Sequence, residues 1–280
     1  MATACQKPRR NGKLSPVPMQ APAGTAMTPR CILITGAGSG IGAGIAAELA
    51  SAGHHLVVTD VNHDAAEGVA ASIRDAGGSA EALALDVTSD DSVAAALAAV
   101  SRPVEVLVNN AGLQHVAPLE EFPIAKWDFL VQVMLVGVAR LTRALLPGMR
   151  ERSFGRIVNI GSIHSLVASP YKSAYVAAKH GLLGFSKVIA LETAGTDITI
   201  NTICPTYVKT PLVDRQIADQ ARTRGIPEAQ VVSEVMLKPM PKGVFITFEE
   251  LAGIAAFLMS PAARNITGHS IDVDGGWTVQ

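Results

Sequence analysis

From Cys31 to the end of the chain, short apolar runs alternate with amphipathic stretches of helical period. The runs are nearly continuous, which is typical of strands buried on both faces of a parallel sheet. Strands separated by helices in this order build a doubly wound α/β domain. We therefore predict a seven-stranded parallel sheet with helices on both faces, with strands at Cys31–Thr35, His55–Asp60, Glu81–Asp86, Val104–Asn109, Arg156–Ile160, Ile198–Ile203 and Ser270–Val273.

The chain after residue 31 shows no internal repeat and no linker, so residues 31–280 are expected to form one domain. Within it, two helical stretches at about Leu212–Thr223 and Pro227–Leu237 are bounded by prolines. Long segments over a site often act as lids. Residues 206–241 are therefore predicted to form a helical lid, and a fixed cap is the alternative.

The first 30 residues differ in composition from everything that follows. They contain five basic residues, no acidic residue and no apolar periodicity, so they bury too little surface to offset the entropy of ordering. We expect a disordered basic leader at residues 1–30. It lacks the apolar core of a secretory signal, while an organelle-targeting role or a start at Met27 stays open.

Charge and cysteine usage narrow the classes of function. The formal net charge of −1 gives no electrostatic reason to expect nucleic acid or a membrane surface as a partner. Cys5, Cys31 and Cys204 lie far apart, which predicts neither a disulfide framework nor a metal site. No apolar run reaches the roughly 20 residues of a membrane span. A cytoplasmic protein that acts on small molecules is expected.

A glycine-rich turn, TGAGSGIG at residues 35–42, joins the first predicted strand to the first predicted helix. Glycines permit the tight turn and the close approach of backbone to a pyrophosphate, which the helix dipole and its free N–H groups then stabilise. A turn of this kind can also be only a turn. Its place in the first βαβ unit favours a dinucleotide site that includes Gly36, Ser39, Gly40, Ile41 and Gly42.

Polar residues follow the next strands, at the sheet edge where ligands of open α/β sheets bind. Asp60 lies about 20 residues after the glycines, where a carboxylate accepts hydrogen bonds from both ribose hydroxyls and repels a 2′-phosphate. This favours NAD, although Asp60 or Asn62 could equally cap the following helix. Beyond the later strands, the same edge is expected to carry Asp86, Val87, Asn110, Ala111 and Gly112.

A candidate proton-transfer group lies between residues 162 and 179. Tyr175 and Lys179 are one helical turn apart and so share a face. A phenol becomes a useful base near neutral pH when a cation a few ångströms away lowers its pKa, and Lys179 is placed to do so. Ser162, at a strand end, can hold a substrate oxygen against the phenol. Taken alone, this spacing of Tyr and Lys occurs in many helices.

Together these motifs resemble the short-chain dehydrogenases/reductases. The matching pieces are TGAGSGIG, Asp60, Asp86, NNAG at 109–112, Ser162, Tyr175-x-x-x-Lys179 and DGG at 274–276. The resemblance implies a Rossmann-like fold, hydride transfer to or from the nicotinamide of NAD, and usually a homotetramer. It implies that Ser162, Tyr175 and Lys179 are catalytic, and that Tyr175, Lys179, Pro205 and Val208 also contact the cofactor.

Within that family, four stretches resemble the bacterial members that oxidise (R)-3-hydroxybutyrate: NAGLQHVAP at 110–118, LVASPYKSAY at 166–175, TPLVDRQI at 210–217 and GGWT at 275–278. The resemblance implies that the substrate carboxylate is bound by Gln114, His164, Lys172 and Gln216 and that Trp277 lines the pocket. Lys172 is three residues before Tyr175, and His164 would point as Ser162 does if the chain stays extended. Each of the five could also be an ordinary surface or core residue.

Two positions depart from the family pattern. Met134 stands where many members have an Asn of a proposed proton relay, and Thr206 stands where a Gly usually follows Pro205. Met134 offers no amide, and Thr206 restricts the backbone near the expected nicotinamide. The alternatives are a 3-oxoacyl-thioester reductase, which would usually prefer NADPH and needs no carboxylate clamp, another short hydroxy acid dehydrogenase, and a weakly active NAD-binding scaffold.

Overall fold

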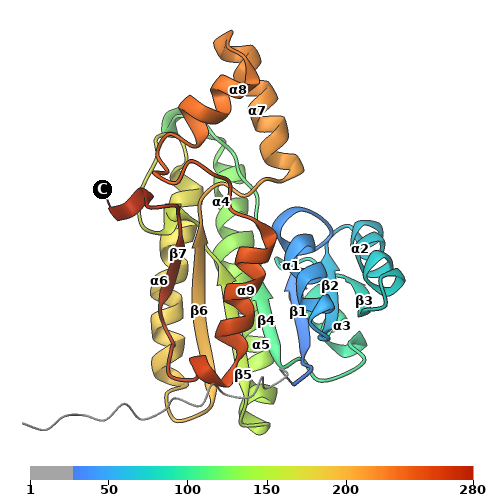
Figure 1. Ribbon diagram of the computed structural model, residues 1–280. Helices are drawn as coiled ribbons and strands as arrows, with labels where there is room; N and C mark the ends of the chain where they lie inside the picture. Colours follow the sequence, from blue (N-terminus) through green and yellow to red (C-terminus); the bar gives the residue numbers. More distant parts are fainter. Residues whose placement is uncertain (1–27, 280) are drawn as a thin grey trace, which may run out of the picture.

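The computed structural model describes residues 28–279, except for the side chains of Pro211, Leu212, Arg215, Asp219 and Thr223. Nearly all of the predicted leader, with Cys5, lies outside the described residues. The described chain forms a parallel seven-stranded sheet in the order β3-β2-β1-β4-β5-β6-β7 (Figure 1). The predicted doubly wound fold is therefore confirmed.

The strand ends agree with the prediction to within two residues, and β3 is displaced as a whole. The strands are β1 Cys31–Thr35, β2 His55–Asp60, β3 Ser79–Ala84, β4 Val106–Asn109, β5 Gly155–Ile160, β6 Ile198–Pro205 and β7 Ser270–Val273. β3 begins and ends two residues before the predicted Glu81–Asp86, because Ser79 pairs with His55 at the start of β2. After β3, the Leu85 N–H still bonds the Asp60 carbonyl at 2.9 Å.

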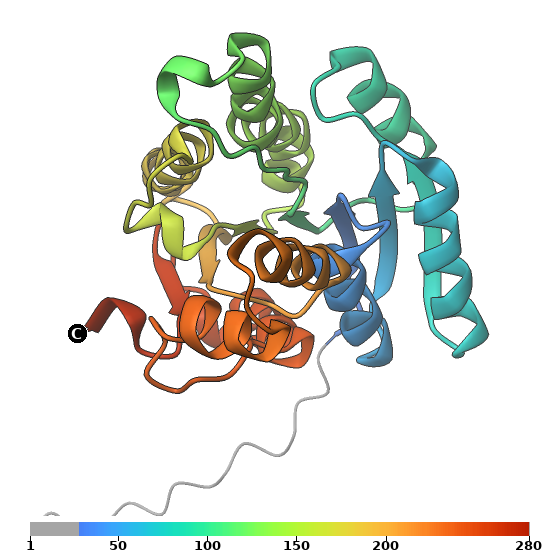
Figure 2. The same ribbon diagram turned by 90° about the horizontal axis from the view of Figure 1, so that it is seen from above.

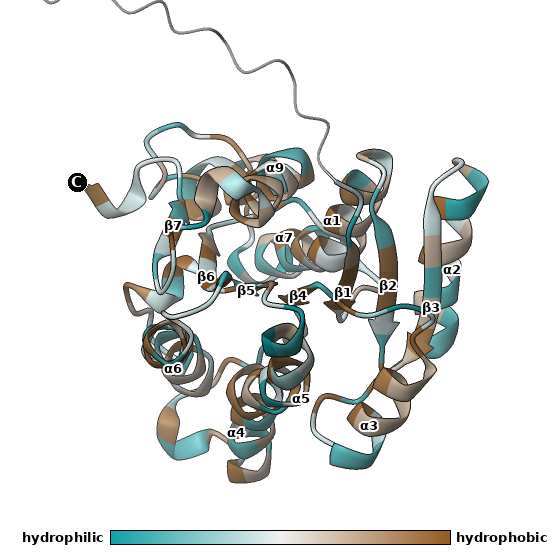
Figure 3. Cartoon of the chain, turned by 90° about the horizontal axis from the view of Figure 1, so that it is seen from below, coloured by the Kyte–Doolittle hydropathy of each residue, from teal (hydrophilic) through white to brown (hydrophobic). Residues whose placement is uncertain are grey.

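Helices cover both faces of this sheet (Figure 3). One apolar core, with Ile34, Val58 and Val108, packs under α1 Gly40–Ser51, α2 His63–Asp75 and α9 Phe248–Met259. The other, with Leu33, Val57 and Leu107, packs under α3 Asp90–Ala99, α4 Ile124–Val131, α5 Gly137–Glu151 and α6 Ser173–Glu192. Neighbouring strand residues thus serve opposite cores, as the pleat requires.

α4 and α5 join through a π-helical turn, Gln132–Val136. The whole stretch Ile124–Glu151 is, by length and composition alone, the one helix within residues 28–279 that could cross a membrane. Leu130, Met134 and Leu141 of this stretch are almost fully buried in the core. Packing of this helix against the sheet therefore also accounts for its apolar character.

A helical pair stands beyond the carboxyl ends of the strands (Figures 1 and 2). It consists of α7 Pro211–Arg224, α8 Glu228–Val231 and a π-helical turn, Val232–Met236. Val213, Ile217, Val231 and Met236 form a small apolar core of their own. These bounds agree with the helices predicted for a lid, and movement of the pair stays a prediction.

A ladder of buried polar side chains crosses the middle of the sheet. The Asn109 amide donates to Asn159 Oδ1 at 2.8 Å, and the Asn159 amide donates to Ser186 Oγ at 3.0 Å. Ser186 Oγ lies 3.1 Å from Thr202 Oγ1. This Asn109–Thr202 ladder links β4, β5, α6 and β6, and its members are at most 4% exposed. Buried groups satisfied in this way fix the pairing of the strands.

Candidate active site

A cavity of about 520 Å³ opens at the carboxyl ends of the strands. It gathers side chains from loops after β1, β2, β3, β4 and β5 and from α6. Of the residues predicted for cofactor binding, those that line it are Gly36, Ser39, Gly40, Ile41, Asp60, Asp86, Val87, Asn110, Ala111, Gly112, Tyr175 and Lys179.

Close backbone contact builds the floor of this cavity. Gly36 has φ +61°, and a Cβ there would lie 2.8 Å from the Ala111 Cα, so glycine is required by both conformation and space. The Asn110 amide donates to the carbonyls of Thr35 and Gly36 at 2.9 and 3.0 Å. A Cβ on Gly42 would lie 2.5 Å from the same amide. Gly42 thus serves packing and does not line the cavity.

The amino end of α1 faces this floor. Ser39 precedes the helix with extended backbone, and its side chain makes no capping hydrogen bond. The first N–H groups and the helix dipole are therefore suited to an anion. Ser39, Gly40 and Ile41 line the cavity at this point, where a pyrophosphate was expected.

Asp60 is not the cap of α2. Asn62 fills that role, accepting from the Ala65 N–H at 3.3 Å. The two Asp60 oxygens accept from the backbone N–H groups of Gly38 and Asn62 at 3.1 and 3.0 Å, and each retains capacity for a further donor. This carboxylate is held rigidly at the cavity wall, as a ribose-binding role requires.

Ser162, Tyr175 and Lys179 come together at the end of β5 and on α6. Ser162 Oγ accepts from the His164 N–H at 3.1 Å, and Lys179 Nζ donates to the Ile160 carbonyl at 2.6 Å. Lys179 Nζ lies 5.7 Å from the Tyr175 ring centroid. Because this ammonium is poorly solvated, burial lowers the pKa of Lys179 to about 8, which is close to neutral pH.

The expected lowering of the Tyr175 pKa is not found in this arrangement. Burial raises the pKa of Tyr175, a hydrogen bond with Ser162 lowers it, and the nearby Cys204 thiol raises it, with a net increase above 10.0. Lys179 donates a hydrogen bond to the Ile160 carbonyl and is not among the groups that shift the Tyr175 pKa. The phenol is therefore protonated at neutral pH.

His164 reaches the site by a route that differs from the prediction. Ser162 caps a 3-10 helix, Ile163–Ser165, so the chain after Ser162 is not extended. The His164 ring nevertheless lies 6.0 Å from the Tyr175 ring and 6.4 Å from the Trp277 ring, between centroids. Burial, with the charges of Lys172 and His180, lowers the pKa of His164 to about 4. This histidine is neutral near pH 7.

Lys172 lies just before α6 and is half-buried. Burial lowers its pKa. Within residues 28–279 its ammonium has no hydrogen bond or ion pair, and its charge acts on the neutral His164. A partly desolvated cation without a counter-ion is suited to bind an anion.

The remaining predicted residues divide between two groups. Gln114 lines the cavity, whereas Ser162, His164, Lys172 and Trp277 do not. Trp277 stacks on Tyr207 with 6.4 Å between ring centroids. Gln216 lies half-buried on α7 and does not line the cavity. Nor do Pro205, at the end of β6, and Val208, which is buried beneath the helical pair.

The structure adds cavity residues that sequence reasoning missed: Val61, Leu85, Leu113, Phe129, Val133, Ile160, Gly161 and Thr210. Thr210 caps α7 through the Val213 N–H, at 3.3 Å. The Thr210-Pro211 pair at the start of a helix could have indicated the cap. No local sequence signal indicated that Thr210 lies beside the glycine turn, near Gly40.

The two departures are accommodated without strain. Met134 is buried within the π-helical turn, where its sulfur would lie 3.6 Å from a Cβ on Gly112. Thr206 donates its N–H to the Val273 carbonyl at 3.1 Å and does not have positive φ. Thr206 therefore introduces no backbone strain at this turn.

Fold and site together define a doubly wound α/β protein in which Ser162, Tyr175 and Lys179 are grouped beside a cavity of about 520 Å³. The family model "short chain dehydrogenase" matches residues 30–221. The chain therefore belongs to the short-chain dehydrogenase family and is an oxidoreductase of that family.

Relatives and solved structures cover nearly the whole chain. It is 45% identical to "D-beta-hydroxybutyrate dehydrogenase" of Rhizobium meliloti (strain 1021), over 89% of this chain and 98% of that protein. The protein of the same name from Cupriavidus necator is 44% identical, over 89% and 97%. A crystal structure of a putative NAD(P)-dependent gluconate 5-dehydrogenase from Beutenbergia cavernae, with bound NADP, is 36% identical with a TM-score of 0.81, covering 91% of this chain and 98% of that one.

Proposed function

We propose that this protein catalyses the reversible, NAD-dependent oxidation of (R)-3-hydroxybutyrate to acetoacetate. The observation that carries the proposal is the half-buried Lys172 ammonium, which has no acidic partner within residues 28–279 and acts on His164 beside Tyr175. A short carboxylate bound there has its C3 hydroxyl near the phenol. The two relatives named as D-beta-hydroxybutyrate dehydrogenases support the same substrate.

The residues present fit a nicotinamide dinucleotide. Gly36 and Ala111 form a cradle that a Cβ would fill, α1 offers free N–H groups, and Asp60 offers carboxylate oxygens at the cavity wall. When bound, NAD supplies the carbon that accepts hydride from C3. Asp60 favours NAD over NADP, because its charge repels a 2′-phosphate.

Three residues of the chain handle the proton. Tyr175 accepts the hydroxyl proton during oxidation and returns it during reduction, and Ser162 orients the substrate oxygen. Lys179, buried and held by the Ile160 carbonyl, provides positive charge below the phenol and is expected to contact the nicotinamide ribose. Because the phenol pKa is raised, neutral pH favours the reductive direction and alkaline pH favours oxidation.

Gln114, His164 and Gln216 complete the proposed carboxylate site around Lys172, with Trp277 as an apolar wall. His164 is neutral and bonds Ser169 Oγ at 2.7 Å through Nε2, so its ring orientation is fixed. Gln216 on α7 can contribute only if the helical pair moves towards the cavity. We therefore propose that residues 206–241 close over the substrate as a lid on a single catalytic domain.

We also propose a cytoplasmic homotetramer, and exposed apolar side chains on α4 and α6 support one of the subunit interfaces that it needs. Ile124 and Phe129 on α4, and Val188 and Leu191 on α6, are each at least 50% exposed. These two helices contact each other on one face of the sheet. A symmetric interface across them would remove this surface from water.

A substrate and cofactor panel tests the proposed function. NADH formation is measured with each 3-hydroxybutyrate enantiomer, with NAD and NADP in parallel. We expect turnover of the R form with NAD at a kcat/KM at least tenfold above every other combination. Reduction of a 3-oxoacyl thioester with NADPH, but no oxidation of the R acid, would replace the proposal with a thioester reductase. NADH binding without turnover of any short hydroxy acid would indicate a scaffold.

A further inference from the structure

A second cavity, of about 350 Å³, lies at the opposite edge of the sheet. Its lining includes the first residues of three strands, Cys31, His55 and Ser79. Strands of this length place it roughly 15–20 Å from the active site, at 3.3 Å per residue. The two cavities have no lining residue in common, so this is a separate site.

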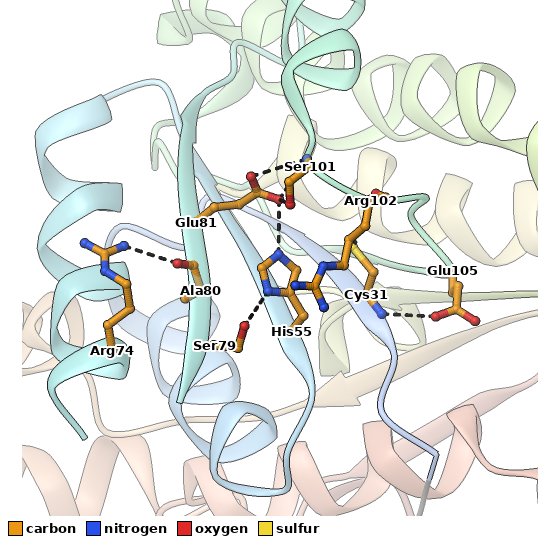
Figure 4. A network of polar contacts seen from close by, with 9 residues as sticks. All are labelled: Cys31, His55, Arg74, Ser79, Ala80, Glu81, Ser101, Arg102 and Glu105. Atoms are coloured by element: carbon orange, nitrogen blue, oxygen red, sulfur yellow. Dashed lines mark hydrogen bonds and ion pairs between the residues drawn. The ribbon is translucent and has the colours of Figure 1, made fainter. Parts of the chain in front are cut away.

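The carboxylates near this cavity are already engaged. Glu105 accepts from the Arg30 guanidinium and from the Cys31 N–H. Glu81 Oε1 accepts from the Ser101 hydroxyl at 2.9 Å and lies 3.1 Å from His55 Nε2 (Figure 4). Glu105 is thus matched by Arg30, and Glu81 is held by Ser101 and His55.

Two guanidinium groups of the lining remain without an acidic partner in the described chain. Arg102 makes no side-chain hydrogen bond or ion pair there, and Figure 4 shows its guanidinium turned towards His55 and Cys31. Arg152 spends one donor on the Val104 carbonyl at 2.7 Å and keeps the others. Burial raises the pKa of the Cys31 thiol to about 12, so the thiol brings no negative charge.

The lining thus carries three guanidinium groups, from Arg30, Arg102 and Arg152, against the single carboxylate of Glu105. Positive charge stays in excess when Glu81 is also counted. Arg102 precedes β4 and Arg152 follows α5, so the two unpaired groups approach the cavity from different segments. Guanidinium groups converging on a hollow are the usual means of binding a phosphate group.

We infer that this amino-edge cavity is a binding site for an anion of the phosphate class, either free phosphate or the phosphate group of an organic monoester. Phosphate carries more charge than a carboxylate near neutral pH and has more acceptor oxygens for Arg102 and Arg152. The site does not depend on the proposed substrate or on the identity of the dinucleotide.

Calorimetric titration with inorganic phosphate, glycerol 3-phosphate and acetate tests the inference, with wild type and Arg102→Gln compared at constant ionic strength. Arg102 is exposed, and its side chain forms no hydrogen bond or ion pair within residues 28–279, so this variant should keep its fold. We expect a phosphate compound to bind at least tenfold more tightly than acetate. The Arg102→Gln substitution should weaken binding of that phosphate compound at least tenfold. Tighter binding of the monoester would identify an organic phosphate as the ligand.

Arg143→Gln is the matched control, because Arg143 is an exposed arginine of α5 that does not line the cavity. It should leave the affinity unchanged. NMR of the histidine ring protons provides a local readout, in which phosphate should shift the His55 signals and leave those of exposed His63 in place. Equal affinity in wild type and Arg102→Gln, or an unmoved His55, would overturn the inference.

Discussion

The two edges of the sheet treat charge in opposite ways. At the amino edge, Arg30 is paired with Glu105, and Glu81 is held by hydrogen bonds with His55 and Ser101. At the carboxyl edge, burial shifts the pKa of Tyr175, Lys179 and Lys172, and two of these groups lack an ionic partner. Groups that cost free energy to bury are retained where chemistry uses them. Burial also shifts the pKa values of Cys31 and His54 at the amino edge, so the shifts identify the reactive edge only together with the cavity that Tyr175 and Lys179 line.

Tyr175→Phe should produce the largest effect, because it removes the proton donor and acceptor while keeping the ring. We expect kcat to fall about 10³-fold, within the range for general acid–base catalysis. NADH affinity, measured by fluorescence titration, should change little. Tyr171→Phe is the control, since Tyr171 is 60% exposed. Equal losses in both variants would deny Tyr175 its assigned role.

Lys172→Met should raise the KM for 3-hydroxybutyrate about 10–100-fold, because a charge-assisted hydrogen bond contributes about 1.5–3 kcal/mol. The kcat should change much less, since carboxylate binding is shared by ground and transition states. Lys187→Met removes an exposed lysine from α6, the helix that follows Lys172, and should have no effect. A purely surface role for Lys172 predicts identical KM values in both variants.

The pH dependence follows from the raised pKa of Tyr175. Oxidation needs the phenolate, so its kcat/KM should rise about tenfold per pH unit on approaching that pKa from below. Reduction needs the protonated phenol and should be flat at neutral pH, then fall above the pKa. Initial rates in both directions between pH 6 and 10 provide the measurement. A flat oxidative profile would mean that another group accepts the proton.

Asp60→Ala should reduce the preference for NAD over NADP by about tenfold, because it removes a negative charge facing the 2′ position. Asp64→Ala is a matched control, since that fully exposed carboxylate lies at the start of α2, outside the cavity. The ratio of kcat/KM for the two cofactors is the readout. An unchanged ratio in Asp60→Ala would assign discrimination to another residue.

Glu81→Gln should have the smallest effect on activity, and it tests the hydrogen-bonded amino edge of the sheet. The change weakens hydrogen bonds from His55 and Ser101 and should lower the free energy of unfolding by about 1–2 kcal/mol. Urea denaturation measures this loss. The kcat should stay within twofold of wild type. A larger loss of activity than of stability would show that the two edges are coupled.

Local features made much of this molecule predictable. The glycine turn, its spacing to Asp60, and Tyr175 with Lys179 rest on short-range geometry, and the structure places all of them at one cavity. The end of β3 was less predictable, because Leu85 is buried although it lies beyond the strand. Hydropathy reports burial and does not distinguish a strand from a buried loop.

Other features depended on a local turn that the prediction missed or on contacts distant in sequence. The 3-10 turn that carries His164 arises from reciprocal hydrogen bonds between Ser162 and Ser165. The position of Thr210 over the glycine turn depends on how α7 leaves β6. The raised pKa of Tyr175 depends on burial, on the hydrogen bond with Ser162 and on the Cys204 thiol of β6. None of these follows from the spacing of residue types.

The Asn109–Thr202 ladder limits the ways in which the strands of the sheet can mispair. If β5 slipped by one residue, the Asn159 amide would turn towards the opposite apolar core, leaving the Asn109 amide and the Ser186 hydroxyl without their partner. Mispaired sheets are therefore penalised at several buried positions at once. The polypeptide has little room for a partly assembled form in which the strands before residue 110 are correct and those after residue 155 are misaligned.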